Sequence, residues 1–277
     1  MPRSLDFDLI SVYTDASNAD RGNVAAVIAL EAEWSKEAMQ RIASDFNQPA
    51  TTFLWPAETA NHYHARWFAP DAEIGLCGHG SAAAAAWSAL RKKGNEITLI
   101  AGDQSITGRA NAAQSRMDIV LDAIPVLEEL KEGEMLSEAI GAQVLKHFRT
   151  GNKNILLLKD EKTLRDLKIQ YHKLRELEHF GYAITAPADG DLHFVSRTIV
   201  PFVQQLEDHG TGSSHAALVP FWSERLGIKE MKARQLSQRG ARFECKLITQ
   251  TDEAAASRVQ LSGQYGHLAR GSYVVRE

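Results

Sequence analysis

Cysteine, long apolar runs and an excess of charge of one sign are all scarce or missing in this sequence of 277 residues. Its two cysteines, Cys77 and Cys245, are too few for a disulfide framework, so we expect reduced thiols in a cytoplasmic protein. No apolar run approaches the roughly 18 residues of a membrane span, and the N-terminus lacks a signal-peptide pattern, so we expect no membrane partner. The net charge of -4 argues against a nucleic-acid partner.

Metal ligands at suitable spacing are also missing. His62 and His64 form a short pair, but no further ligands follow at the spacing of a zinc site, so we expect no metal. What is present is a composition of 44% hydrophobic and 24% charged residues, which is typical of a globular domain. The length allows one large domain or two of moderate size.

The chain has two halves with the same plan, which we place at residues 1–124 and 125–277. Each half runs from strands through a helix and further strands to a glycine turn and an alanine-containing helix. We predict amphipathic helices at residues 35–47, with Ser35 as the N-cap, and at residues 163–181. The helices after the two glycine turns are predicted at about 79–93 and 211–226, and the repeated plan predicts a duplication.

The two glycine turns also resemble each other in their letters. Gly78-His79-Gly80-Ser81 opens one helix and Gly210-Thr211-Gly212-Ser213 opens the other, with paired alanines following at the same offset. Glycine lets the backbone approach a ligand closely, and the first amides of a helix are free to bind an anion. If both turns face one cleft, they could hold a carboxylate or an enolate-like charge.

Side chains near the turns could donate hydrogen bonds or move protons. Ser81 and Ser213 offer hydroxyl donors, whereas His79, Asp208, Cys77 and His209 could transfer protons beside a carbonyl. Each has a plainer alternative: Cys77 as a small buried apolar residue, Asp208 as a helix cap, and both serines as N-caps. The letters match neither a Walker A motif nor a Rossmann fingerprint, in which Ala83 would have to be glycine.

Motifs in one order along nearly the whole chain resemble the phenazine-biosynthesis PhzF-like family. They are Thr14-Asp15, Gly22-Asn23, Arg66 to Pro70, Glu73, Leu76 to His79, Phe194 to Arg197, Glu207-Asp208, Thr211 to Ser213, His215, Pro220 to Trp222, Leu226-Gly227, Gln235, Ser237, Arg239-Gly240 and Ala269 to Gly271. The resemblance implies an α/β fold like that of diaminopimelate epimerase. Two similar halves would each wrap a curved, barrel-like sheet around a central helix, with the C-terminal strand able to return to the first half.

The resemblance also implies a homodimer that needs no cofactor. The founding activity is the isomerisation of dihydro-3-hydroxyanthranilate, a small carboxylate, by proton shuttling. The resemblance assigns catalytic roles to His79, Asp208 and Ser213. The backbone and hydroxyl groups of the two turns would bind the substrate: Gly78, Gly80, Ser81, Gly210, Thr211, Gly212 and Ser214.

One departure from the family pattern concerns its main acid/base, a glutamate. Asn47 and Phe53 fix the register, and the glutamate position is then Ala50, whose methyl group cannot carry a proton. Glu58 mimics the family letters but comes after Phe53. We therefore do not expect dihydro-3-hydroxyanthranilate isomerisation, but isomerisation or epimerisation of another small carboxylate. A homologue that has lost catalysis and binds a metabolite or a protein is the alternative.

A second departure points to proline racemase and hydroxyproline epimerase. Cys77-Gly78-His79-Gly80 followed by Ser81 resembles these relatives, which use two cysteines as acid and base. Cys77 would be the first, whereas His209 occupies the position of the second. A racemase or epimerase of a proline-like amino acid that uses Cys77 with His209 therefore stays open, since a thiolate beside an imidazole is activated.

Overall fold

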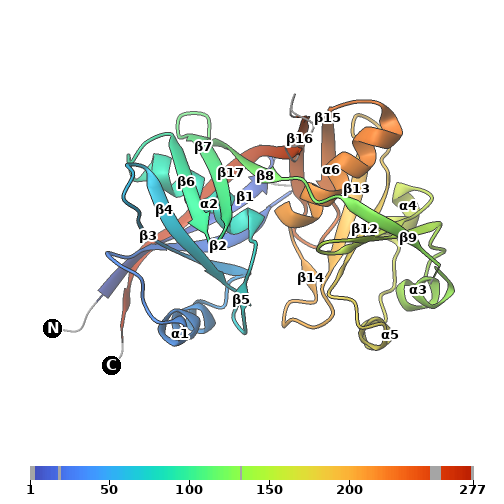
Figure 1. Ribbon diagram of the computed structural model, residues 1–277, viewed down its shortest axis with the longest axis horizontal. Coiled ribbons are helices and arrows are strands. Elements are labelled where there is room, and N and C mark those ends of the chain that lie inside the picture. The colour runs from blue at the N-terminus through green and yellow to red at the C-terminus, as the bar shows by residue number, and fades with distance from the viewer. Residues whose placement is uncertain (1–3, 18–19, 132, 250–256, 276–277) are drawn as a thin grey trace. The chain divides into compact units, whose positions relative to one another are not determined.

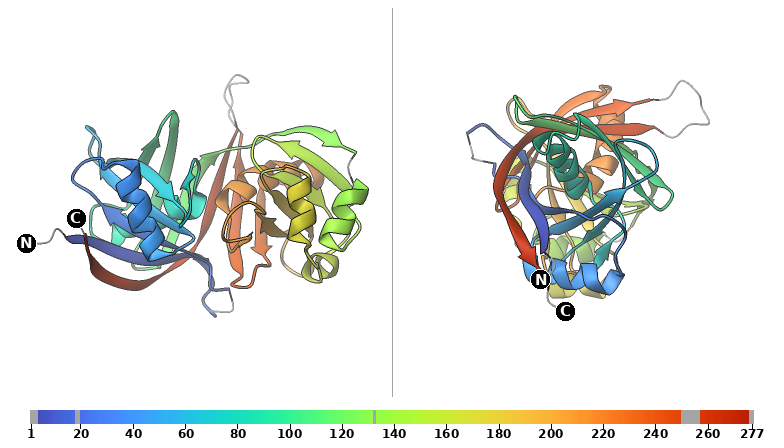
Figure 2. Two further views of the ribbon diagram at one scale, coloured as in Figure 1. Left: turned by 90° about the horizontal axis from the view of Figure 1, so that it is seen from below. Right: turned by 90° about the vertical axis from the view of Figure 1, so that its left-hand side faces the viewer.

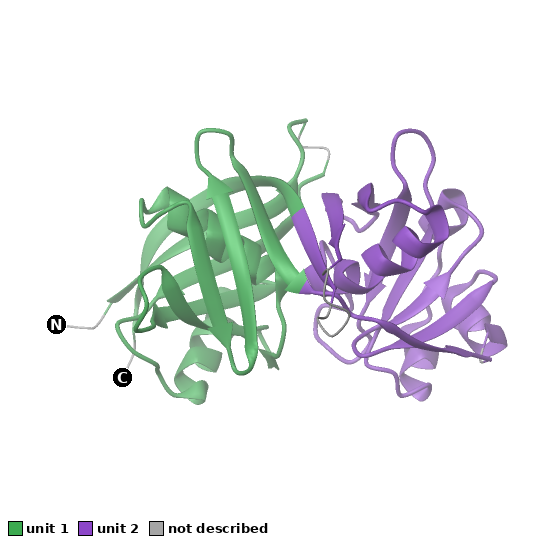
Figure 3. Cartoon of the chain, turned by 45° about the horizontal axis from the view of Figure 1, so that its top comes forward, with its two compact units in different colours: residues 1–121, 262–277 green, residues 122–261 purple. Residues whose placement is uncertain are grey.

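The chain is a mixed α/β protein that divides into two compact units (Figure 3). The computed structural model describes residues 4–17, 20–131, 133–249 and 257–275. Unit 1 comprises Met1–Leu121 and Ser262–Glu277, and unit 2 comprises Asp122–Leu261. The first division therefore lies close to the predicted boundary after residue 124, and the C-terminal segment belongs to unit 1. No helix in the described part of the chain is long and apolar enough to cross a membrane.

Unit 1 is built from strands that begin at both ends of the chain. β1 pairs antiparallel with β17, so that Ser4 lies opposite Val274 and the first and last strands are neighbours (Figure 1). The strands are β1 (Ser4–Thr14), β2 (Asn23–Ala29), β3 (Ala50–Pro56), β4 (His62–Phe68), β5 (Glu73–Ile74), β6 (Glu96–Ala101), β7 (Gln104–Asn111), β8 (Arg116–Asp122) and β17 (Arg258–Val274). The helices are α1 (Lys36–Phe46) and α2 (Gly78–Leu90).

Unit 2 has its own strands, and its described residues form four helices. The strands are β9 (Val126–Leu130), β10 (Lys146–Thr150), β11 (Asn154–Leu157), β12 (Tyr182–Pro187), β13 (Phe194–Ile199), β14 (Glu207–Asp208), β15 (Glu230–Gln235) and β16 (Ala241–Ile248). The helices are α3 (Gly133–Ile140), α4 (Glu161–Arg165), α5 (Tyr171–Glu176) and α6 (Gly212–Leu226).

Strand pairing follows one scheme in both units. In unit 1, β2 is parallel to β3, β3 antiparallel to β4, β4 antiparallel to β5 and parallel to β6, and β6 antiparallel to β7. In unit 2 the same sequence of pairings joins β11, β12, β13, β14, β15 and β16. Each unit therefore contains the same motif, which leads from a short strand into a buried helix.

Alanine explains how α2 fits inside unit 1. The helix contacts β1, β2, β3, β6 and β7, and every residue from Gly78 to Ala89 is buried. A Cβ atom added to Gly108 on β7 would lie 2.8 Å from the Cβ of Ala85, so both small residues are needed for this close approach. Figure 2 shows α2 inside the curve of the unit 1 strands and α1 outside it.

The predicted helix at residues 35–47 is confirmed as α1. The Ser35 hydroxyl accepts a hydrogen bond from the Ala38 amide at 3.2 Å, and Met39 and Ile42 are buried. The predicted helix at 163–181 is wrong, because the segment forms α4 and α5 with an extended break between them. The amides of Lys168 and Gln170 donate to carbonyls at the end of α3 instead of continuing a helix.

Candidate functional site

The first glycine turn leads from β5 into α2, and Cys77 is the N-cap of this helix. The Cys77 Sγ accepts a hydrogen bond from the Gly80 amide at 3.4 Å and lies 3.6 Å from the His79 Nδ1 atom. Both side chains are buried, at 3% and 5% exposure. The turn therefore brings the two proton-transfer candidates of unit 1 into contact at the N-terminus of a helix.

Gly80 lies where a side chain has no room. A Cβ atom there would lie 2.6 Å from Trp67 Cδ1 and 2.8 Å from Thr52 Oγ1, whereas Gly75 has no neighbouring atom within 4 Å of an added Cβ. We expect Gly80→Ala to lower the free energy of unfolding by about 1–3 kcal/mol, since it overpacks a closed site. Urea denaturation measures the change, with Gly75→Ala as the control. Equal stabilities of the two variants would refute this description of the turn.

Ser81 and Ala50 contribute less to this turn than the sequence suggests. The Ser81 hydroxyl donates to the Cys77 carbonyl at 2.8 Å, so its proton is used within α2 and the geometry does not support the predicted role as a donor to a ligand. Ala50 is the first residue of β3, lies opposite Ala25 and is fully buried. Its methyl group offers no titratable atom there, and its correspondence to the family's glutamate stays a prediction.

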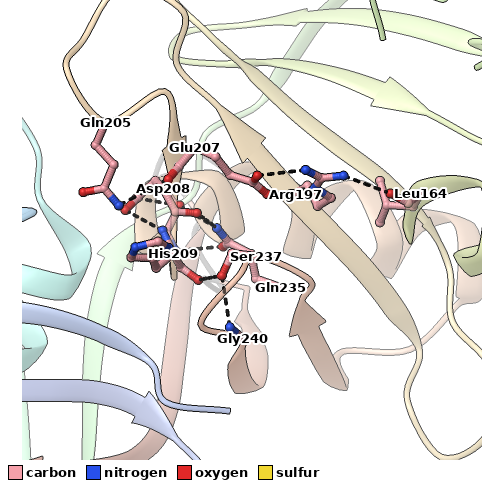
Figure 4. Close-up of polar contacts among 10 residues, drawn as sticks. Leu164, Arg197, Gln205, Glu207, Asp208, His209, Gln235, Ser237 and Gly240 are labelled. Carbon is pink, nitrogen blue, oxygen red and sulfur yellow. Dashed lines mark hydrogen bonds and ion pairs between the residues drawn. The ribbon is translucent and has the colours of Figure 1, made fainter. Parts of the chain in front are cut away.

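The second glycine turn follows β14, where Asp208 ends the strand. One carboxylate oxygen of Asp208 accepts from the His209 amide at 2.9 Å, and the other accepts from the Thr211 hydroxyl at 2.6 Å. The Gln235 side-chain amide ties this turn together, because it donates to the Asp208 carbonyl and accepts from the Thr211 amide. These contacts hold the carboxylate in one orientation (Figure 4).

Two further contacts fix the backbone on either side of Asp208. Arg197 makes two hydrogen bonds to the Glu207 carboxylate, of 2.7 and 2.8 Å, and these bonds hold the pKa of Arg197 above its ordinary value. On the other side, the Ser237 hydroxyl donates to the His209 carbonyl at 2.7 Å (Figure 4). The backbone on both sides of Asp208 is therefore held by side-chain hydrogen bonds within unit 2.

The start of α6 is not capped as the start of α2 is. Thr211 is the N-cap, but among the described residues its side chain accepts no hydrogen bond from an amide of the first helical turn. Its hydroxyl donates to the Asp208 carboxylate instead. The Ser213 hydroxyl instead accepts from the ammonium of Lys153, at 3.0 Å. Sequence reasoning missed Lys153, although Gly151-Asn152 repeats the letters of Gly22-Asn23 at the same place in the fold.

The helix starts correct the register of the internal repeat. α2 begins at Gly78 and α6 at Gly212, so Cys77 corresponds to Thr211 and His79 to Ser213, two residues away from the match of letters. The Arg66–Glu73 pair repeats the Arg197–Glu207 pair, with each glutamate four residues before its N-cap. The predicted central helices at 79–93 and 211–226 are Gly78–Leu90 and Gly212–Leu226.

Two side chains near the start of α6, and the second cysteine on β16, are buried within the fold. His215 is fully buried and lies 3.7 Å from the Phe243 ring; burial lowers the pKa of His215 to about 4, so it is neutral at pH 7. Ser214 Oγ is 3.0 Å from Thr198 Oγ1 and is buried. Burial also raises the pKa of the Cys245 thiol far above its usual range, which makes this cysteine unreactive.

Two units that repeat one pairing scheme, each with a turn leading into a buried helix, define a mixed α/β protein with an internal repeat. A family described as phenazine biosynthesis-like protein matches residues 10–271, and this chain belongs to it. Phenazine biosynthesis-like domain-containing protein 2 of Mus musculus is 33% identical over 257 residues, which are 83% of this chain and 88% of the relative. An uncharacterized isomerase of Pseudomonas aeruginosa is 30% identical over 94% of this chain and 96% of its own.

Solved structures support the fold. A phenazine biosynthesis protein of the PhzF family from Enterococcus faecalis matches with a TM-score of 0.85 and 26% identity over 99% of this chain and 100% of its own. A hydroxyproline epimerase from Agrobacterium vitis, solved with bound trans-4-hydroxy-L-proline, has a TM-score of 0.71 over 100% of this chain and 95% of its own. At 10% identity this second likeness concerns the fold alone.

Proposed function

We propose that the chain is an isomerase or epimerase that moves a proton on a small carboxylic acid without a cofactor. The observation that carries the proposal is the turn before α6. It holds a fixed carboxylate, Asp208, three residues before the N-cap of a helix whose first amides lack a side-chain cap in the described part of the chain. Uncapped amides and the positive end of the helix dipole suit a substrate carboxylate.

Asp208 is the proposed proton carrier, and Ser213 is the proposed hydrogen-bond donor to the substrate. A carboxylate that accepts hydrogen bonds in a rigid turn can take a proton from the carbon beside a substrate carboxylate and return it. The charge that develops on the substrate is stabilised by donors that are already in position. The relay role predicted for His79 and the loss of the family's glutamate at Ala50 stay part of this proposal.

Solvent isotope exchange tests the proposal. Protein dialysed against a chelator is incubated in D₂O with a panel of amino, hydroxy and unsaturated carboxylic acids, and each acid is followed by mass spectrometry and chiral chromatography. A gain of one deuterium on carbon, with inversion or a shifted double bond, is expected for at least one acid. Binding of acids without any exchange would favour the homologue that has lost catalysis.

A racemase or epimerase that uses Cys77 is the second candidate, and the contact with His79 favours it. The Sγ atom receives the Gly80 amide and lies beside the His79 imidazole, which is the setting of a reactive thiolate. The predicted partnership with His209 stays a prediction.

Iodoacetamide tests this second candidate. If Cys77 is the proton carrier, alkylation abolishes exchange, substrate protects against it, and Cys77→Ala loses exchange by about 10²-fold or more. Cys245→Ala is the control, because Cys245 is buried and unreactive. Full exchange by Cys77→Ala would exclude the thiol mechanism.

A further inference from the structure

A buried lysine approaches the start of α6 from a distant part of the chain. Lys153 lies in the turn before β11, where the Thr150 hydroxyl donates to its carbonyl at 2.9 Å. Its stem packs beside Gly181, whose added Cβ would lie 3.4 Å from Lys153 Cγ. The residue is only 7% exposed, although lysine is among the residues least often buried.

The Lys153 ammonium determines the direction in which the Ser213 hydroxyl donates. Its contacts include Asn152 Oδ1 at 2.8 Å and Ser213 Oγ at 3.0 Å, and it lies 5.3 Å from the centre of the Phe180 ring. An ammonium can only donate, so the Ser213 oxygen is the acceptor and its own proton must point elsewhere.

The Ser213 proton has no acceptor among the residues that the structure describes. Ser213 is 5% exposed, and Lys153 is its one side-chain partner in the described ranges. A buried donor without an acceptor is costly, which indicates that this group serves a ligand. Ser81 in unit 1 shows the contrast, because its hydroxyl donates to the Cys77 carbonyl.

The same place is electrostatically suited to an anion. Ser213 is the second residue of α6, so the ammonium lies at the positive end of the helix dipole, where a cation is unfavourable and an anion is favourable. A carboxylate there would accept from the Ser213 hydroxyl and from helix amides while it lies near a positive charge. A neutral amide would have only part of these interactions.

We infer that Lys153 is a positioning residue that turns the Ser213 hydroxyl toward the ligand and makes the start of α6 selective for carboxylates over their neutral amides. The inference rests on the proposed function for its site, and it extends that function by naming the group that recognises the substrate's charge.

The test compares acids with their amides by calorimetry. The probes are benzoate with benzamide and trans-4-hydroxy-L-proline with its amide, and the variants are Lys153→Met and Lys153→Gln. In the wild type we expect carboxylates to bind about 10-fold or more tightly than amides. In both variants the ratio of the two affinities should fall toward one. Lys146→Met, an exposed lysine on β10, is the control and should keep the wild-type ratio.

The ratio of the affinities for acid and amide distinguishes a positioning role of Lys153 from a merely structural one. If Lys153 were merely structural, its replacement would weaken the binding of the acid and of the amide by the same factor. The ratio of the two affinities would then stay unchanged, which would overturn the inference. The inference also predicts that Ser213→Ala weakens binding much less in the Lys153→Met background than in the wild type, whereas additive losses would contradict it. Absence of acid binding by the wild type across the probes would overturn it as well.

The two proposals can fail separately. If the acid-to-amide affinity ratio depends on Lys153 but the protein shows no isotope exchange, the carboxylate site is supported and the isomerase activity is excluded. If the protein shows isotope exchange but the Lys153 variants keep the wild-type ratio of acid to amide affinity, the isomerase activity is supported and the role of Lys153 is excluded.

Discussion

Asp208→Asn is expected to lower the rate of α-proton exchange by about 10²- to 10⁴-fold, the usual contribution of a positioned acid/base. Asparagine keeps the size of the side chain and can still accept from the His209 amide, so the turn should keep its shape. What it loses is the group that carries the proton. The measurement is the initial rate of deuterium incorporation into the best acid of the panel.

The control for this variant is Asp191→Asn, an exposed aspartate of the same unit. It should exchange at the wild-type rate, and both variants should melt cooperatively near the wild-type temperature. If the Asp208→Asn protein exchanges at close to the wild-type rate, Asp208 is not the proton carrier. That result would favour the second candidate, in which Cys77 carries the proton.

The second large effect concerns the stability of unit 1. Asp8 on β1 is fully buried, and its carboxylate accepts hydrogen bonds from Arg91 at 2.8 Å, Arg270 at 2.9 Å and His267 Nε2 at 2.8 Å. Asp8→Asn is expected to cost about 3–5 kcal/mol of folding free energy, because it leaves cations gathered around a neutral group. Chemical denaturation gives the value, with Asp6→Asn as the exposed control on the same strand.

The pH dependence of this contribution has a definite sign. Burial alone would raise the pKa of Asp8, but the hydrogen bonds from Arg270 and Arg91 outweigh it and hold the pKa below its ordinary value of 3.8. The stabilisation is therefore complete above the ordinary value and is lost as the pH falls through the lower, folded-state value. The difference in stability between wild type and Asp8→Asn should shrink in that acid range. A constant difference would contradict the ion-pair explanation.

Local chemistry in the sequence predicted the parts of the fold that depend on short-range contacts. Ser35 begins α1 because its hydroxyl caps the Ala38 amide. Alanines are strong helix formers, and at Ala85 the close approach of Gly108 leaves no room for a larger side chain. The segment at 163–181 was wrongly predicted, because its apolar spacing continues while tertiary hydrogen bonds from Lys168 and Gln170 to α3 break the helix.

The candidate site could be predicted only in part. Asp208 and Ser213 stand in a recognisable turn, but the position of the helix start is set by the N-cap, so matching letters placed the repeat two residues out of register. The letters Gly151-Asn152 mark the turn, but nothing in the local sequence shows that Lys153 contacts Ser213. Lys153 is 60 residues from Ser213, and their contact exists only once the turn before β11 reaches the start of α6.

A crystal structure of the protein with an acid that exchanges its α-proton tests the central claim most directly. We expect a substrate carboxylate within about 2.7–3.2 Å of Ser213 Oγ and the first amides of α6, with the Asp208 carboxylate beside the exchanging carbon. A carboxylate bound away from the start of α6, or an exchanging carbon out of reach of Asp208, would contradict it.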